Sequence, residues 1–144
     1  MDKGLQAQFL TPLFLQDIDG QTMEVIAPLV FLSLELHGIF RVPKGFVTDF
    51  ASVPRGLWNL WPRVGKYSKA AVLHDASYRG DLLSKYGQRV TLIRPLADRL
   101  FLEAMRASGV GAFTARVFYL AVRAFGEPAY RGLDHLQSAS PVEP

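Results

Sequence analysis

The stretch Ala71-Val-Leu-His-Asp-Ala-Ser-Tyr-Arg79 places a histidine and an adjacent carboxylate inside a strongly helical segment. Its spacing puts His74 and Tyr78 on one face of the predicted helix, one turn apart. Asp75 is rotated by about 100° from His74 in an ideal helix, so it faces a neighbouring loop or pairs with Arg79. The segment therefore predicts a helix that carries ionisable groups on more than one side.

A second carboxylate, Asp98, lies on the apolar stripe of a later helix. Phe101 and Met105 share that stripe, whereas the charged residues of the helix take the opposite side. A buried charge without a partner is heavily penalised. We therefore expect His74 and Asp98 to meet, with the carboxylate accepting a hydrogen bond from one ring nitrogen.

A His–carboxylate pair of this kind has two interpretations. In the catalytic one, Asp98 orients His74, whose free ring nitrogen takes a proton from water or a hydroxyl. Asp75 then holds a divalent cation such as calcium, which stabilises an oxyanion. In the structural one, the His–Asp hydrogen bond and the nearby Tyr78 satisfy buried polar groups and lock the helix packing.

The segment Thr48-Asp-Phe-Ala-Ser-Val-Pro54 also has two interpretations. In the first, Asp49 closes a side-chain turn and Ser52 caps a short helix that begins near Pro54. In the second, Asp49 lines the same pocket as His74 and is a second candidate metal ligand, or Ser52 is a nucleophile. No Gly-x-Ser-x-Gly elbow surrounds Ser52, which favours capping for this residue.

The first half of the chain is typical of strands and the second half of helices. Asp19-Gly20 lies between two apolar segments and is a strong hairpin signal. Pro43-Lys-Gly45 predicts a second turn, between strands over residues 38–42 and 46–49. Helices are expected over residues 67–79, 95–108 and 111–125. The predicted fold class is α+β, a small antiparallel sheet packed with three to four helices.

Composition indicates one globular domain over residues 1–137, followed by a disordered Ser/Pro/Glu-rich tail over residues 138–144. The chain has no cysteine, so the fold does not depend on disulfides or thiolate metal sites. The net charge is only +3 with scattered basic residues, which does not favour nucleic-acid binding. The most apolar window is too short and too polar for a transmembrane segment.

Several segments together resemble a known family, the domain of unknown function 1353. They are Val42-Pro-Lys-Gly-Phe-Val-Thr-Asp-Phe-Ala-Ser-Val-Pro54, Ala70-Ala-Val-Leu-His-Asp75 with Tyr78-Arg79, Ala97-Asp98 with Phe101, and Ala121-Val-Arg-Ala-Phe-Gly126. The resemblance covers roughly residues 38 to 127. Because that family occurs largely in bacteriophages and prophages, it implies a phage origin.

A narrower resemblance links His74-Asp75, Tyr78 and Asp98 to the helix pair of phospholipase A2. It implies that His74 is a general base, Asp75 a calcium ligand, Tyr78 a supporting hydroxyl and Asp98 the residue that orients His74. The glycine-rich calcium loop and the disulfides of that family are absent from this sequence.

These observations predict a phage-encoded protein that is made in the host cytoplasm and becomes part of the virion tail, neck or baseplate. Its expected partners are other phage structural proteins, with a homo-oligomer as one option. Its His–Asp site either hydrolyses a bond of the cell envelope or serves only as a packing element. A protein that binds a bacterial partner during host takeover is a third option.

Overall fold

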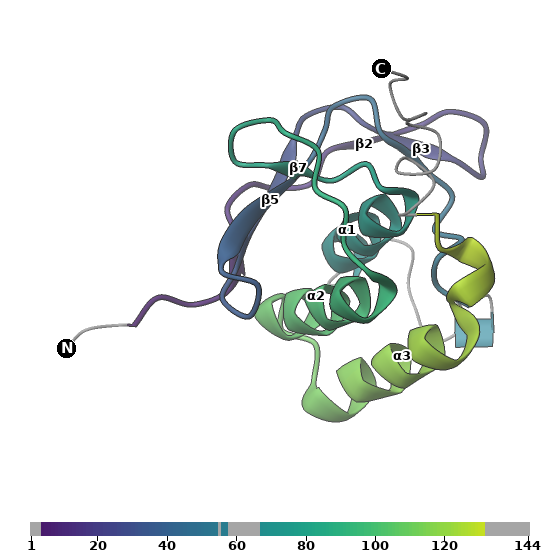
Figure 1. The fold of residues 1–144 in the computed structure, drawn as a ribbon. Coiled ribbons are helices and arrows are strands. Elements are labelled where there is room, and N and C mark those ends of the chain that lie inside the picture. The colour runs from purple at the N-terminus through teal and green to yellow at the C-terminus, as the bar shows by residue number, and fades with distance from the viewer. Residues whose placement is uncertain (1–3, 55, 58–66, 132–144) are drawn as a thin grey trace, which may run out of the picture.

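The N-terminal half forms two small antiparallel sheets. The computed structural model describes residues 4–54, 56–57 and 67–131 (Figure 1). The first sheet has the strand order β1-β4-β5-β7. Its members are β1 (Gln8–Phe9), β4 (Leu29–Ser33), β5 (Gly38–Val42) and β7 (Leu83–Ser84). Residues alternate between buried and half-buried along β4, as expected for a strand with one face on the core.

The second sheet has the strand order β2-β3-β6. Its members are β2 (Leu15–Asp17), β3 (Met23–Val25) and β6 (Val47–Thr48). The predicted hairpin at Asp19-Gly20 joins β2 to β3 and is confirmed. Asp19 accepts hydrogen bonds from the backbone N–H groups of Gln21 and Thr22, which fixes this turn.

The strands on either side of Pro43-Lys-Gly45 do not form the single sheet that the sequence suggests. The turn exists, with the Phe46 N–H donating to the Pro43 carbonyl. However, Gly45 adopts a left-handed φ of 93°, and Gly45 and Phe46 then exchange backbone hydrogen bonds with Val25. The chain therefore leaves β5 and continues into β6 beside β3, in the other sheet.

Three helices make up most of the second half and agree closely with the predicted ranges. α1 spans Ser68–Arg79, α2 spans Arg94–Ala107 and α3 spans Ala112–Phe125. A short 3-10 helix, η2, follows at Glu127–Ala129. Gly80 ends α1 in the left-handed conformation, with φ of 74°. The predicted short helix after Pro54 and the predicted C-terminal tail lie largely or wholly outside the described residues.

The helices pack in sequence, with α2 in contact with both α1 and α3 (Figure 1). α1 is buried along nearly its whole length, from Ser68 to Tyr78, because it also packs against β5 and β6. The core joins the inner residues of both sheets to those of all three helices. Within the part of the chain that the structure describes, no helix has the length and apolarity needed to cross a bilayer. The α+β fold class is confirmed.

Candidate functional site

His74 lies on the buried side of α1 and contacts polar groups through both ring nitrogens. Its Nε2 is 2.8 Å from Oδ1 of Asp98, and its Nδ1 is 3.0 Å from Oγ of Ser52. An ionised carboxylate can only accept, so Nε2 carries a proton and donates to Asp98, and in the neutral ring Nδ1 accepts from the Ser52 hydroxyl. The predicted hydrogen bond between His74 and Asp98 is confirmed, and Ser52 extends it into a line of three side chains.

Asp98 sits near the start of α2, and three hydrogen-bond donors and one further cation surround its carboxylate. Tyr78 donates its hydroxyl to Oδ1 at 2.5 Å, beside the His74 bond. Arg123, from α3, donates to Oδ2 at 2.9 Å, and Arg94 forms an ion pair with the same oxygen at 3.7 Å. One carboxylate therefore links side chains from α1, α2 and α3.

These contacts keep Asp98 ionised and Tyr78 protonated. Burial alone would raise the pKa of Asp98, but its interactions with His74, Tyr78 and Arg123 outweigh burial and hold that pKa below its ordinary value. Burial and the hydrogen bond to Asp98 raise the pKa of Tyr78 well above its ordinary value. Tyr78 is therefore a fixed hydrogen-bond donor.

The site is closed to solvent. The exposed fraction is 0% for His74, Asp98 and Tyr78, and 1% for Ser52. The His74 ring is also packed between aromatic rings, with centroid distances of 4.1 Å to Tyr78 and 4.4 Å to Phe101. A substrate would need these groups to separate before it could reach either ring nitrogen.

The loop from Thr48 to Ser52 positions the serine. Thr48 accepts a hydrogen bond from the Phe50 N–H, and Asp49 accepts one from the Ala51 N–H, as the predicted side-chain turn requires. Phe50 has a φ of 58°, which is uncommon for a residue with a Cβ. Burial of its ring, which is 6% exposed, offsets this strain and holds the loop against the core.

Asp75 faces this loop and belongs to a second polar cluster. It accepts a hydrogen bond from the Thr48 hydroxyl at 2.6 Å and lies 3.5 Å from the guanidinium of Arg79. Arg79 also pairs with Asp49 at 2.9 Å. The structure thus brings the two predicted metal ligands together around a guanidinium. The described residues contain no group of three or more His, Asp or Glu side chains arranged to hold a metal ion.

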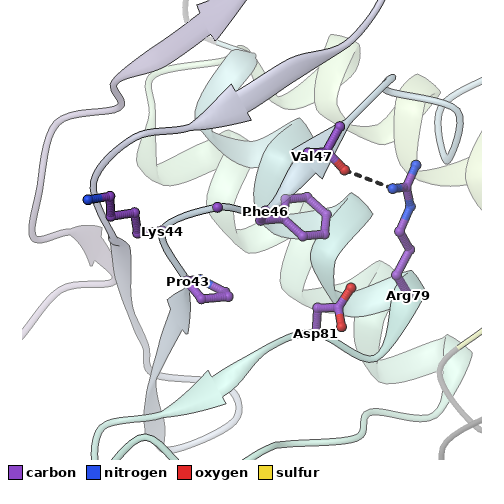
Figure 2. Close-up of a pocket in the computed structure, with 7 residues that line it drawn as sticks. Pro43, Lys44, Phe46, Val47, Arg79 and Asp81 are labelled. Carbon is purple, nitrogen blue, oxygen red and sulfur yellow. Dashed lines mark hydrogen bonds between the residues drawn. The ribbon is translucent and has the colours of Figure 1, made fainter. Parts of the chain in front are cut away.

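A pocket opens on the outer side of Arg79 (Figure 2). In this view Phe46 and Asp81 lie next to Arg79, and Pro43 and Lys44 line the side of the pocket away from it. Arg79 donates to the Val47 carbonyl at 2.8 Å. Neither His74 nor Asp98 is among the residues that line it. The pocket therefore belongs to the Arg79 cluster and not to the His–Asp pair.

The ionised form of Asp75 destabilises the fold, whereas the ionised form of Asp98 stabilises it. Burial raises the pKa of Asp75, and the Arg79 charge and the Thr48 hydrogen bond only partly oppose it. The pKa of Asp75 is therefore higher in the folded protein than in the unfolded chain. As the pH rises from the unfolded pKa to the folded pKa, ionisation of Asp75 lowers the free energy of unfolding. We expect Asp75→Asn to be neutral or stabilising at pH 7, with a smaller advantage at acidic pH. Chemical denaturation at several pH values measures this, and a large loss of stability at neutral pH would contradict it.

Comparisons with known proteins give the family. Residues 23–122 match the family described as protein of unknown function (DUF1353). The chain belongs to this family. It is also similar to the uncharacterized protein y4jT of Sinorhizobium fredii (strain NBRC 101917 / NGR234), with 34% identity over 87 residues. That alignment covers 59% of this chain and 23% of the relative, so the chain spans less than a quarter of that protein. No solved structure matches the chain.

The part that matches the family contains almost the whole polar network. Ser52, His74 and Asp98 fall inside residues 23–122, whereas Arg123 lies one position beyond them. The family resemblance expected from the sequence is therefore confirmed.

Sequence reasoning missed the cations that neutralise Asp98. Arg94 stands four residues before Asp98, a spacing that signals an ion pair on a helix. The sequence gives a weaker indication for Arg123, which is a charged residue next to the buried side of a largely apolar helix. Arg94 also donates to the carbonyls of Val122 and Arg123. These bonds tie the start of α2 to the end of α3.

Glu103 makes further polar contacts, with the end of β4, that the helical pattern did not predict. Its expected place was the outer face of the helix. Instead its carboxylate accepts hydrogen bonds from the Ser33 hydroxyl and from the backbone N–H groups of Leu34 and Glu35. Glu103 thereby attaches α2 to the end of β4.

Proposed function

We propose that this protein is a non-enzymatic, phage-encoded virion component in which the Asp98 network holds three helices together. The observation that carries the proposal is the complete burial of His74 and Asp98, both of which have an exposed fraction of 0%. A general base must come within hydrogen-bond reach of the proton that it removes. In this structure Ser52 occupies that position at Nδ1 and Asp98 occupies it at Nε2, so neither ring nitrogen is available to activate water.

Electrostatics supports the same proposal. An orienting carboxylate in a catalytic pair stabilises the positive charge that develops on the histidine. Asp98 instead shares its charge with Arg123 and Arg94, so less of it is available to His74. A carboxylate that accepts three hydrogen bonds and pairs with a further cation is well suited to fixing helix positions.

The phage and virion part of the proposal rests on the resemblance of the motifs to a family found largely in phages. The expected partners are other structural proteins of the particle, in the tail, neck or baseplate. The test is to purify particles from an induced host and measure whether the protein co-purifies with them at a fixed ratio to a known virion protein. A strictly monomeric protein that is absent from purified particles would rule out the proposal.

A second candidate function is hydrolysis of an ester or similar bond of the cell envelope, and one observation favours it. Ser52, His74 and Asp98 form a continuous hydrogen-bonded line with distances of 3.0 Å and 2.8 Å. Serine, histidine and an acid in one line are the components of a nucleophilic site. In this alternative, after the site opens, the serine Oγ attacks the carbonyl carbon of the ester while Nδ1 of His74 takes the hydroxyl proton. The ester bond breaks and the leaving alcohol receives that proton from His74. Water then hydrolyses the acyl-serine in the same way, which restores the Ser52 hydroxyl and releases the acid.

Activity assays separate the two candidates. The purified protein is incubated with phospholipid vesicles and with peptidoglycan, with and without calcium, alongside the Ser52→Ala and His74→Ala variants. The structural proposal predicts no turnover by any of the three proteins. Hydrolysis by the wild type that is lost in folded Ser52→Ala, as judged by circular dichroism, would establish the second candidate and overturn the first.

A further inference from the structure

The outer face of α3 is apolar, although it is exposed. Phe113 is 82% exposed and Leu120 is 56% exposed, and both lie on the side of α3 opposite the buried Phe118 and Val122. In Figure 1 this helix lies at the edge of the molecule, with α2 on its inner side. The solvent-facing side of a surface helix normally carries polar residues, so large exposed apolar side chains there are typical of a surface that a partner covers. The exposed face of α3 therefore indicates a partner.

The charged residues of α3 are both arginines. The 22 residues from Ala104 to Phe125 include three arginines and no aspartate or glutamate, although the whole chain has 13 acidic residues. Arg106 and Arg116 are exposed. Arg116 lies one turn along α3 from Phe113, and Arg106, at the end of α2, donates to the Val110 carbonyl in the turn before α3. Arg123 is the third, and it is paired with Asp98. A negatively charged surface that accepts aromatic and aliphatic side chains therefore complements this face.

We propose that the outer face of α3 and the turn before it bind the surface of an anionic phospholipid bilayer. Phe113 and Leu120 would enter the boundary between the headgroups and the acyl chains, while Arg106 and Arg116 contact lipid phosphates. This combination of an apolar stripe with flanking cations is the physical basis of interfacial helix binding. The proposal does not depend on the function proposed for the His–Asp network.

A second copy of the chain fits this face less well. A two-fold pairing of α3 with itself would bring Arg116 of both copies to the same interface, and α3 has no acidic residue to pair with either one. Stable dimers also bury roughly 800 Å² per partner, which is more than one face of a 14-residue helix supplies. A bilayer needs neither a matching acid from the chain nor a minimum area.

Vesicle sedimentation tests the proposal with the full chain. One set of vesicles contains phosphatidylcholine mixed with phosphatidylglycerol, and the other contains phosphatidylcholine alone. We expect binding to the anionic vesicles that weakens as salt is added, and much weaker binding to the neutral ones. Phe113→Ser and Leu120→Ser should each lower the partition coefficient by at least about tenfold. Arg116→Gln should lower it by about fivefold.

Matched controls come from the opposite part of the surface. Tyr86 is also 82% exposed, so Tyr86→Ser removes an aromatic ring of equal exposure. Lys85→Gln removes one exposed charge, as Arg116→Gln does. Both controls should bind as the wild type does. All of these positions are exposed, and thermal melting verifies that each variant is folded.

Three results would overturn the proposal. One is the absence of vesicle binding, and another is binding that Phe113→Ser and Leu120→Ser leave unchanged. Equal binding to neutral and anionic vesicles would remove the role of the arginines. If vesicle binding is absent and Phe113→Ser instead dissociates a dimer seen by light scattering, the face belongs to a second copy.

Discussion

Asp98→Asn is expected to lower the free energy of unfolding by about 3–5 kcal/mol, the usual effect of removing one partner from a buried charge pair. For a chain of this size the melting temperature should fall by about 10–20 °C. The physical reason is that Arg123 and Arg94 lose their shared counter-charge while both remain part-buried. Thermal and chemical denaturation measure the change.

An amide cannot replace the carboxylate in either orientation. With its NH2 group toward the arginines, a donor faces two cations. With its NH2 group at the Oδ1 position, it faces His74 and Tyr78, which both donate there. His74 can exchange tautomers to accept this bond, but the Tyr78 hydroxyl must then find another acceptor. Each unsatisfied buried group adds to the loss of stability.

The pH dependence gives this prediction a sign. The pKa of Asp98 is lowered in the folded protein. Its contribution to the free energy of unfolding is therefore complete above the unfolded carboxyl pKa of about 3.9 and is lost as the pH falls through the folded pKa. The difference between wild type and Asp98→Asn should therefore shrink on acidification. Asp49→Asn is the control, because its ion pair with Arg79 is part-exposed and contributes at most about 1 kcal/mol. Equal effects of the two variants at neutral pH would be incompatible with the proposed network.

Gly126→Ala should have the next largest effect after Asp98→Asn and lower the free energy of unfolding by about 3 kcal/mol. A Cβ at this position would lie 2.6 Å from the Tyr78 hydroxyl and would also collide with the carbonyl oxygen of Val122. The Tyr78 hydroxyl is fixed by Asp98 and the carbonyl belongs to the backbone, so neither can move freely. The clash therefore displaces Tyr78 or the end of α3.

Gly111→Ala provides a control for this effect at the other end of α3. A Cβ there meets no atom within 4 Å, and the φ of −60° suits any residue. The change should cost less than about 1 kcal/mol, mainly through the altered helix start. If Gly126→Ala is as mild as Gly111→Ala, Tyr78 is not held tightly against the end of α3.

Sequence periodicity predicted the helices and the meeting of His74 with Asp98 for a clear reason. Two ionisable groups on apolar helix stripes can be buried only together, so the pattern alone pairs them. Ser52 could not be assigned in the same way, because a serine before a proline fits a helix cap equally well. Its actual contact depends on the left-handed Phe50, a tertiary feature that propensities do not indicate.

The division of the strands into two sheets also could not be predicted from the sequence pattern. Pro43-Lys-Gly45 satisfies the rules for a turn between neighbouring strands. The backbone pairing of Gly45 and Phe46 with Val25 diverts the chain instead, and it is a long-range contact. Arg123 was missed for a related reason, since its partner depends on how α3 packs across α2. Local patterns predicted the elements, and tertiary contacts determined which side chains meet.

The central claim is that His74 and Asp98 form a closed pair that water does not reach, and NMR of the His74 ring tests it most directly. The measurement is the hydrogen-exchange rate of the Nε2 proton in the protein labelled at histidine nitrogen. We predict that this proton is observed, shares a hydrogen bond with Asp98 and exchanges as slowly as the backbone amides at the centre of α1. An Nε2 proton that exchanges far faster than those amides would contradict the account, because it would show a site open to solvent and available for catalysis.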